Sequence, residues 1–192
     1  MGRGEWRGVD VCLWWIGDAA ADHDLLGTLR RQTEQVFHVT ARAWLGRDRP
    51  TDSFDGRRQQ HSSTRILKWL IDSRPEHATK VVGITDVDLF IPILTFVYGE
   101  AQLGGTAAVV STARLLSDSV FRQDFDLFTA RLMKECVHEL GHTFGLLHCP
   151  LPTCVMARSV NLLHVDTKNP ALCHDCQSRY AEIRKQGHEH HE

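Results

Sequence analysis

The sequence has no long hydrophobic run and no strong excess of charge of either sign. Its longest early apolar segment, residues 11–16, is too short for a signal-peptide core and far too short to span a bilayer. Lysine and arginine together number 22 against 24 aspartates and glutamates, which gives a formal net charge of -2. Without a cationic excess to neutralise phosphates or anionic headgroups, neither nucleic acid nor a membrane surface is an expected partner.

The chain also lacks the motifs of secreted and lipid-anchored proteins. Trp6 stands where an N-myristoylation signal needs a small hydroxyl residue, and no asparagine begins an N-x-S/T glycosylation site. These absences predict a soluble cytoplasmic protein, in which thiols stay reduced and clustered cysteines more often bind metal than form disulfides. Four of the six cysteines lie between residues 149 and 176.

At 192 residues the chain fits one compact domain, residues 1–192. Apolar periodicity, capping residues and glycine or proline breaks predict both strands and helices, and the chain starts with a β-α unit. The predicted strands span residues 9–16, 37–45, 80–85 and 106–111, and the predicted helices span residues 22–36, 62–74, 124–144 and 175–185. Residues 149–168 show little regular periodicity.

The last turns of the long helix carry the pattern HExxH. His138 and His142 are four residues apart, so on a helix both imidazoles lie on one face and can share a metal ion. Zinc is bound well by two neutral imidazoles. Glu139 follows the first histidine, so its carboxylate can lie over the open position of the metal and accept a proton from a water there.

Two further residues extend this motif to HExxHxxGxxH. Gly145 lets the chain leave the helix, and His148 can then swing toward the metal as a third ligand. Three protein ligands leave a fourth zinc position for water. The alternative is a surface helix with three solvated histidines and a helix-ending glycine. Such a helix would not need histidine, glutamate and glycine at these particular positions, whereas the zinc motif needs every one of them.

A second group of metal-binding residues follows the helix. Cys149 and Cys154 have C-x4-C spacing, and Cys173 and Cys176 have C-x2-C spacing, which together suit a structural zinc held by four thiolates. Two disulfides, four buried thiols or a nucleic-acid-binding zinc ribbon are the alternatives. Because successive side chains of an extended chain point to opposite sides, His148 and Cys149 can each face a different metal, which would couple the two sites.

The combined pattern resembles a known family of the metzincin clan, the archaemetzincins. It consists of HExxHxxGxxHC, the C-x4-C spacing, the segment Cys154-Val155-Met156 and the final CxxC. The upstream segments GITDVDLFIPILTFVYGEA and GGTAAVVS and the pair Arg114-Leu115 are also similar, so the resemblance covers most of the chain from about residue 80. One departure is the interval from Met156 to Cys173, which is about a residue shorter than usual. Alone, Met156 would be read as core packing, but the resemblance assigns it to the methionine turn beneath the zinc.

The resemblance implies a metzincin-like zincin fold of the α/β (α+β) class. In that fold a twisted, mostly parallel mixed sheet has an antiparallel edge strand above the cleft, a backing helix and an active-site helix. Residues 1–145 would form the N-terminal subdomain, and residues 146–192 a small irregular C-terminal subdomain with the Met-turn and the four-cysteine zinc site. Residues 105–111 match the edge strand by position, so a peptide substrate is predicted to pair with the backbone of Gly105, Thr106, Ala107 and Ala108.

The sequence therefore predicts a monomeric zinc metallopeptidase that binds two zinc ions, one catalytic and one structural, and takes a peptide or protein as substrate. Glu139 is the expected general base, which accepts a proton from water and passes it to the departing amine. Several metzincins place a tyrosine after the methionine turn, but residues 157–163 contain none, and no spacing argument places Tyr180. The rival hypothesis is a zinc-bearing protein on the same scaffold that binds a peptide without cleaving it.

Overall fold

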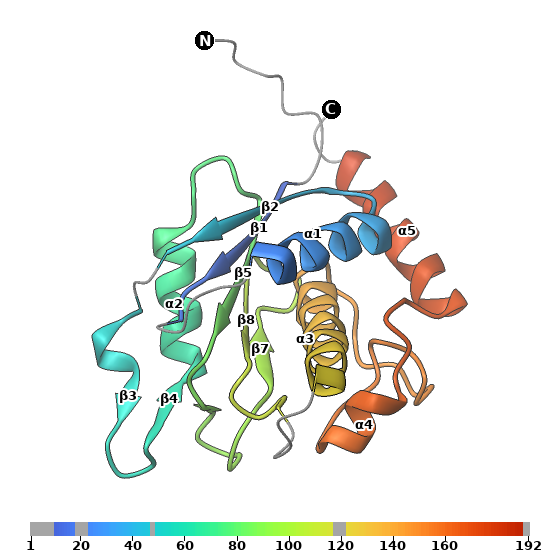
Figure 1. Ribbon diagram of the computed structural model, residues 1–192. Helices are drawn as coiled ribbons and strands as arrows, with labels where there is room; N and C mark the ends of the chain where they lie inside the picture. The colour runs from blue at the N-terminus through green and yellow to red at the C-terminus, as the bar shows by residue number, and fades with distance from the viewer. Residues whose placement is uncertain (1–9, 18–22, 47–48, 117–121, 190–192) are drawn as a thin grey trace.

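A five-stranded sheet forms the centre of the molecule, in the order β2-β1-β5-β8-β7 (Figure 1). The structure is a computed structural model that describes residues 10–17, 23–46, 49–116 and 122–189. Four strands run parallel, and the fifth, β7 (Gly99–Ala101), is antiparallel to its neighbour. The parallel strands are β1 (Asp10–Trp15), β2 (Thr40–Leu45), β5 (Lys80–Thr85) and β8 (Ala107–Ser111). The predicted mixed, mostly parallel sheet is confirmed.

Helices cover both faces of this sheet (Figure 1). The helices α1 (His23–Phe37) and α3 (Arg122–Thr143) pack on one face, and α2 (Ser63–Ser73) packs on the other. A 3-10 turn (Thr51–Ser53) precedes a smaller sheet of β3 (Phe54–Asp55), β4 (Gln60–Ser62) and β6 (Leu89–Phe90). After α3 the chain forms α4 (Leu162–Thr167) and α5 (His174–Glu189). No helix in the described part of the chain has the length and apolar character needed to cross a membrane.

The alternation of side chains along β1 divides the interior into two hydrophobic layers. Val11 and Leu13 point toward α1 and α3, whereas Cys12 and Trp14 point toward α2, and all four are buried. Because both faces of the strand are covered, its sequence reads as a continuous apolar run, as expected for a parallel strand in the middle of an α/β sheet.

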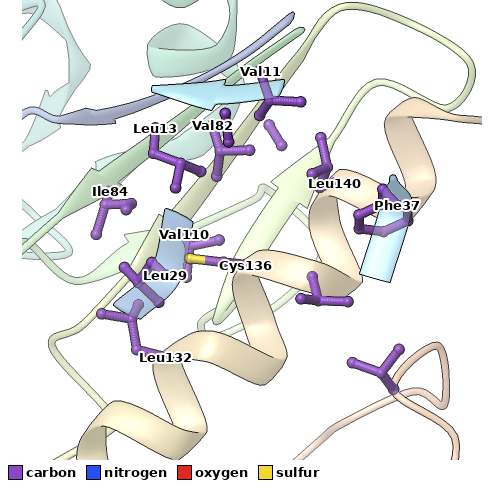
Figure 2. Packing of buried hydrophobic residues seen from close by; sticks show 14 of the residues in the cluster. Val11, Leu13, Leu29, Phe37, Val82, Ile84, Val110, Leu132, Cys136 and Leu140 are labelled. Carbon is purple, nitrogen blue, oxygen red and sulfur yellow. The ribbon is translucent and has the colours of Figure 1, made fainter. Parts of the chain in front are cut away.

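The packing of α3 fixes which of its side chains face solvent. Leu132, Cys136 and Leu140 recur at four-residue spacing and lie against the sheet, in the same buried cluster as Val82 and Val110 (Figure 2). Burying each leucine contributes about 1.5–3 kcal/mol of transfer free energy, so this stripe sets the rotation of the helix about its axis. The histidines of HExxH lie off this apolar stripe, on another side of the helix.

The prediction that residues 105–111 form the antiparallel edge strand is wrong. β8 lies between β5 and β7, runs parallel to β5 and has all five residues buried. Its unbroken apolar sequence is typical of a strand covered on both faces, while the short β7 has the composition of an edge. The backbone groups of β8 are therefore engaged by strands on both sides. The residues that lose their predicted substrate-binding role are Gly105, Thr106, Ala107 and Ala108.

The other predicted elements agree with the structure to within four residues at each end. The sequence reading missed α4 and the short strands β3, β4, β6 and β7. The helix α4 has six residues, fewer than two turns, and the four strands have two or three residues each, which is too short for an apolar period to be recognised.

Candidate metal centre and active-site cleft

The structure brings the three predicted histidines together at the end of α3. The ligand atoms of His138, His142 and His148 all lie within 4.8 Å of one another. His138 and His142 come from successive turns of α3, and the chain then leaves the helix at Gly145, whose φ of +93° is a left-handed conformation that favours glycine. The turn at Gly145 is what returns His148 to the other two rings.

Hydrogen bonds orient the first two rings so that their Nε2 atoms face each other. The Nδ1 atom of His138 lies 2.8 Å from the carbonyl oxygen of Val155, and that of His142 lies 2.7 Å from the carbonyl oxygen of Leu146. A carbonyl only accepts, so each Nδ1 carries the proton and each Nε2 of a neutral ring presents a lone pair. The two Nε2 atoms are 3.2 Å apart. Two ligands at about 2.05 Å in a tetrahedral site are separated by roughly 3.3 Å, so this pair fits zinc.

Burial keeps the three imidazoles in the form that binds metal. It lowers the pKa of His138 well below the ordinary value, and it also lowers the pKa of His142 and of His148. The rings are therefore neutral at pH 7, and neutral imidazole is the ligand form.

Glu139 lines the same cleft as His138 and His148, and this cleft has a volume of about 250 Å³. Its carboxyl group is buried between α3 and β7, where a Cβ added to Gly99 would lie 2.8 Å from Oε1. Burial raises the pKa of Glu139 well above its usual value, the charge of Glu135 raises it further, and Lys168 opposes the shift. A side chain at position 99 would fill the space that this carboxyl group occupies, so glycine is required there.

The four clustered cysteines also converge. The Sγ atoms of Cys149 and Cys173 are 3.8 Å apart, as are those of Cys154 and Cys176, and all four lie within 4.8 Å of one another. A disulfide needs about 2.05 Å between sulfur atoms. Two thiolates at about 2.3 Å from a tetrahedral zinc are separated by roughly 3.8 Å. The distances fit a zinc site and exclude disulfides among these four residues.

A short segment links the two groups of ligands. The backbone N–H of Cys149 donates to the carbonyl oxygen of Met156 over 2.9 Å, and Cys149 forms a β-bridge with Ala157. Met156 is fully buried beneath α3, where its Sδ would lie 2.5 Å from a Cβ added to Gly141. The residues around the methionine therefore contact both the active-site helix and the chain that carries His148.

The sequence reading missed an ion pair in the wall of the cleft. Glu135 lines the cleft beside His138, and its Oε1 accepts a hydrogen bond from Lys168 Nζ over 3.0 Å, with both side chains almost fully buried. Glu135 precedes His138 by three residues, so helical spacing alone places it on the same face. Lys168 lies 33 residues further on, and no local pattern connects the two.

Neither tyrosine of the chain stands directly after the methionine turn. Tyr180 lies in the core, where its hydroxyl donates to the carbonyl oxygen of Phe37 over 2.8 Å. Tyr98 lines the cleft on the side of β7, and burial raises the pKa of its phenol. The cleft is lined by residues from the segment before β7, from α3 and from the segment after Met156, namely Leu94, Thr95, Phe96, Val97, Tyr98, Gly99, Glu135, His138, Glu139, His148, Arg158, Ser159 and Val160.

Comparison with known proteins places this geometry in a family. Residues 57–182 match the model of peptidase family M54. An archaemetzincin from Methanopyrus kandleri is 41% identical over 138 residues, which cover 72% of this chain and 75% of that protein. The crystal structure of archaemetzincin from the same organism superposes with a TM-score of 0.83 at 33% identity, covering 96% of this chain and 98% of the other. The structure of a zinc-dependent peptidase from Methanocorpusculum labreanum gives a TM-score of 0.79 at 26% identity, covering 88% and 99%.

Proposed function

Since this chain belongs to the archaemetzincin family, peptidase family M54, and is a zinc metallopeptidase, we propose that His138, His142 and His148 hold the catalytic zinc and that Glu139 is the general acid/base. One observation carries this assignment. The unprotonated Nε2 atoms of His138, which is buried, and His142, which is partly buried, face each other at 3.2 Å, and both rings lie next to the buried Glu139 along α3. Lone pairs at that distance repel unless a cation lies between them.

Bound zinc supplies a Lewis acid that polarises the scissile carbonyl and makes a water molecule more acidic. Glu139 takes a proton from the attacking water and delivers it to the nitrogen of the departing amine. This role requires the carboxylate form, which burial disfavours but which a dication at the neighbouring imidazoles favours. The carboxyl group of Glu139 is held between α3 and Gly99, at the cleft, so this side chain needs little reorganisation for the proton transfer.

We assign the substrate-pairing role to β7 in place of β8. Along an antiparallel pair, backbone groups point alternately toward the partner strand and away from it. The carbonyl of Tyr98 accepts from Ser111 N over 2.8 Å, and Gln102 N donates to Ala107 O over 3.0 Å. The intervening Gly99 and Ala101 therefore direct their N–H and C=O groups outward, where an extended peptide can pair with them.

The four cysteines would hold a second, structural zinc, giving two zinc ions per chain. Their tetrahedral distances support this stoichiometry. Thiols in zinc-binding geometry, without disulfides among them, also suit the reducing cytoplasm that we expect as the location of the protein.

Replacement of the general base tests the proposal. Purified zinc-loaded protein is incubated with a peptide library, and the products are compared with those of Glu139→Ala and of a control, Glu182→Ala, which removes an exposed carboxylate from α5. We expect Glu139→Ala to retain the zinc content of the wild type and to lose cleavage by about two orders of magnitude or more, with no change in the control.

The same digest separates the two hypotheses about function. Cleavage by Glu139→Ala at the wild-type rate would remove Glu139 from the mechanism. Binding of peptides without cleavage by the wild-type protein itself would favour the zinc-bearing binding protein over the enzyme.

A further inference from the structure

We propose that Glu100 is a positioning residue that sets the place of the substrate-pairing strand β7 beside the zinc ligands, by joining this strand to the N-terminus of α2. The inference rests on the proposed function, because it concerns the strand to which a peptide substrate would pair. Glu100 does not line the cleft and belongs to neither group of metal ligands, and it acts on the site through space, where its charge adds to the effect of burial in raising the pKa of Glu139.

The strand β7 needs an anchor because it is short and lies at the edge of the sheet. It has three residues, all partly exposed, and pairs on one side alone, with β8. Edge elements with few backbone hydrogen bonds open at low free-energy cost. Glu100 is the middle residue of the strand, opposite Val109 in the ladder. Holding Glu100 therefore holds the whole strand.

The side chain of Glu100 reaches the first turn of α2, on the opposite side of the sheet from α3. Its Oε2 accepts a hydrogen bond from the hydroxyl of Ser63 at 2.5 Å, and both carboxylate oxygens lie 3.2 Å from Thr64 Oγ1. Ser63 is fully buried. The hydroxyl also lies 3.0 Å from the carbonyl oxygen of Phe90, but it has one proton, and the closer, charged acceptor is the stronger one.

The N-terminus of α2 is a favourable place for a negatively charged side chain. The preceding residue, Ser62, makes no side-chain cap hydrogen bond to the helix, so Glu100 supplies a negative charge where the helix dipole is positive. These contacts hold Glu100 in one place relative to α2, which is itself packed against β5 and β8 through Ile66 and Leu70.

On its other face β7 lies directly against the catalytic carboxyl group. A Cβ on Gly99 would approach Glu139 Cγ to 2.6 Å and the carbonyl oxygen of Val109 to 2.7 Å, so the strand has no room to move inward. Because α2 packs over β8, the hydrogen bonds of Glu100 to Ser63 and Thr64 oppose movement of β7 away from β8 in the plane of the sheet. Together the two contacts set the distance between the outward backbone groups of Gly99 and Ala101 and the histidines, and this distance decides whether a paired peptide meets the metal.

Loss of the anchor is expected to weaken peptide binding more than it slows the chemical step. The variants Glu100→Ala and Ser63→Ala each remove one side of the contact, and Glu100→Gln keeps an oxygen that accepts from Ser63. The matched control is Glu76→Ala, which removes an exposed carboxylate from the loop after α2. KM and kcat are measured with a hexapeptide chosen from the cleaved products of the library digest, together with zinc content. The Kd of the same labelled hexapeptide is measured in a Glu139→Ala background.

We expect Glu100→Ala to raise KM and Kd about tenfold, with unchanged zinc content and kcat within about twofold of the wild type. Ser63→Ala should raise them less, because the contacts of Glu100 with Thr64 remain, and the double variant should be no worse than Glu100→Ala, because the serine hydroxyl acts through Glu100. Glu100→Gln should restore most of the affinity.

An unchanged KM and Kd in Glu100→Ala would overturn the inference, as would a loss confined to kcat or to zinc content. Additive effects of the two single variants would mean that Glu100 acts without Ser63, and would also overturn it. Failure of the wild-type protein to cleave any peptide is a different result, because it would reject the proposed function on unmodified protein. If Glu100→Ala fails to fold, Ser63→Ala and Glu100→Gln decide the matter by the same comparison.

Discussion

Replacement of Gly141 by alanine tests whether Met156 supports the active-site helix as the structure indicates. The added Cβ would lie 2.5 Å from Met156 Sδ and 3.0 Å from its Cε. Non-bonded atoms normally approach to about 3.5–4.0 Å, so the overlap is roughly 1 Å. Met156 is fully buried, and the interior of a folded protein holds few voids into which a side chain can withdraw.

Two opposing contributions determine the size of this effect. Replacing glycine by alanine within a helix stabilises the folded protein by about 1 kcal/mol, whereas overpacking a buried site destabilises it by about 1–3 kcal/mol. The control is Gly27→Ala in α1, where the nearest atom to the new Cβ is the end of the Arg31 side chain at 3.5 Å, so the helical gain is realised there without a clash. Gly141→Ala should therefore be less stable than Gly27→Ala by about 1–3 kcal/mol.

Thermal unfolding of both variants measures this difference, provided the free zinc concentration is the same, because bound zinc adds to apparent stability. For a chain of this size each kcal/mol corresponds to about 2–4 °C in Tm. Combining Gly141→Ala with Met156→Ala should cancel the overpacking cost and show strong non-additivity. Equal stabilisation by Gly141→Ala and Gly27→Ala would refute the packing of Met156 against α3.

Two other substitutions test the coupling of the metal sites and an ion pair that joins α4 to α3. Cys173→Ser should lower zinc occupancy at the histidines as well as at the cysteines. Metal analysis, for which the expected wild-type value is two zinc ions per chain, detects this loss, and full occupancy at the histidines would contradict the coupling. Asp166 accepts two 2.7 Å hydrogen bonds from Arg131, which lower its pKa in the folded state. A lowered folded pKa stabilises the protein above the unfolded value of about 3.9 and loses this effect as the pH falls through the folded value. Asp166→Asn should therefore cost about 2 kcal/mol at pH 7 and less at pH 3, below the unfolded value, in denaturant unfolding, and an equal loss at both pH values would exclude the ion pair as its cause.

The proximity of the predicted ligands followed from the sequence because most of its determinants are local. Helical spacing brings together His138 and His142, a glycine turn returns His148, and paired spacings bring the cysteines near one another. Each step involves residues close in the chain, for which backbone geometry leaves few arrangements. The helix carrying the motif was predicted to within two residues at each end for the same reason, since its apolar stripe extends over several turns.

The position of the edge strand did not follow, because it depends on which strands pair. The unbroken apolar run of residues 107–111 is compatible with burial on both faces, but it does not say which strands pair on either side of it. Its cover by α2 and α3 also comes from segments that are distant in sequence. The ion pair of Glu135 and Lys168 is another example, since the lysine reaches α3 through the placement of α4. Long-range packing determined the features that the sequence reading missed.

The segment Cys154-Val155-Met156 shows why the two metal sites are expected to act together. The thiol of Cys154 belongs to the four-cysteine cluster, the carbonyl of Val155 orients the ring of His138, and Met156 contacts α3 with its side chain and Cys149 with its carbonyl oxygen. Three consecutive residues thus hold three different parts of the site. Because the backbone between them is continuous, movement of Cys154 after loss of its metal would displace the carbonyl that fixes the tautomer of His138. A zinc ion with no part in the chemistry would in this way determine whether the catalytic ligands are in place.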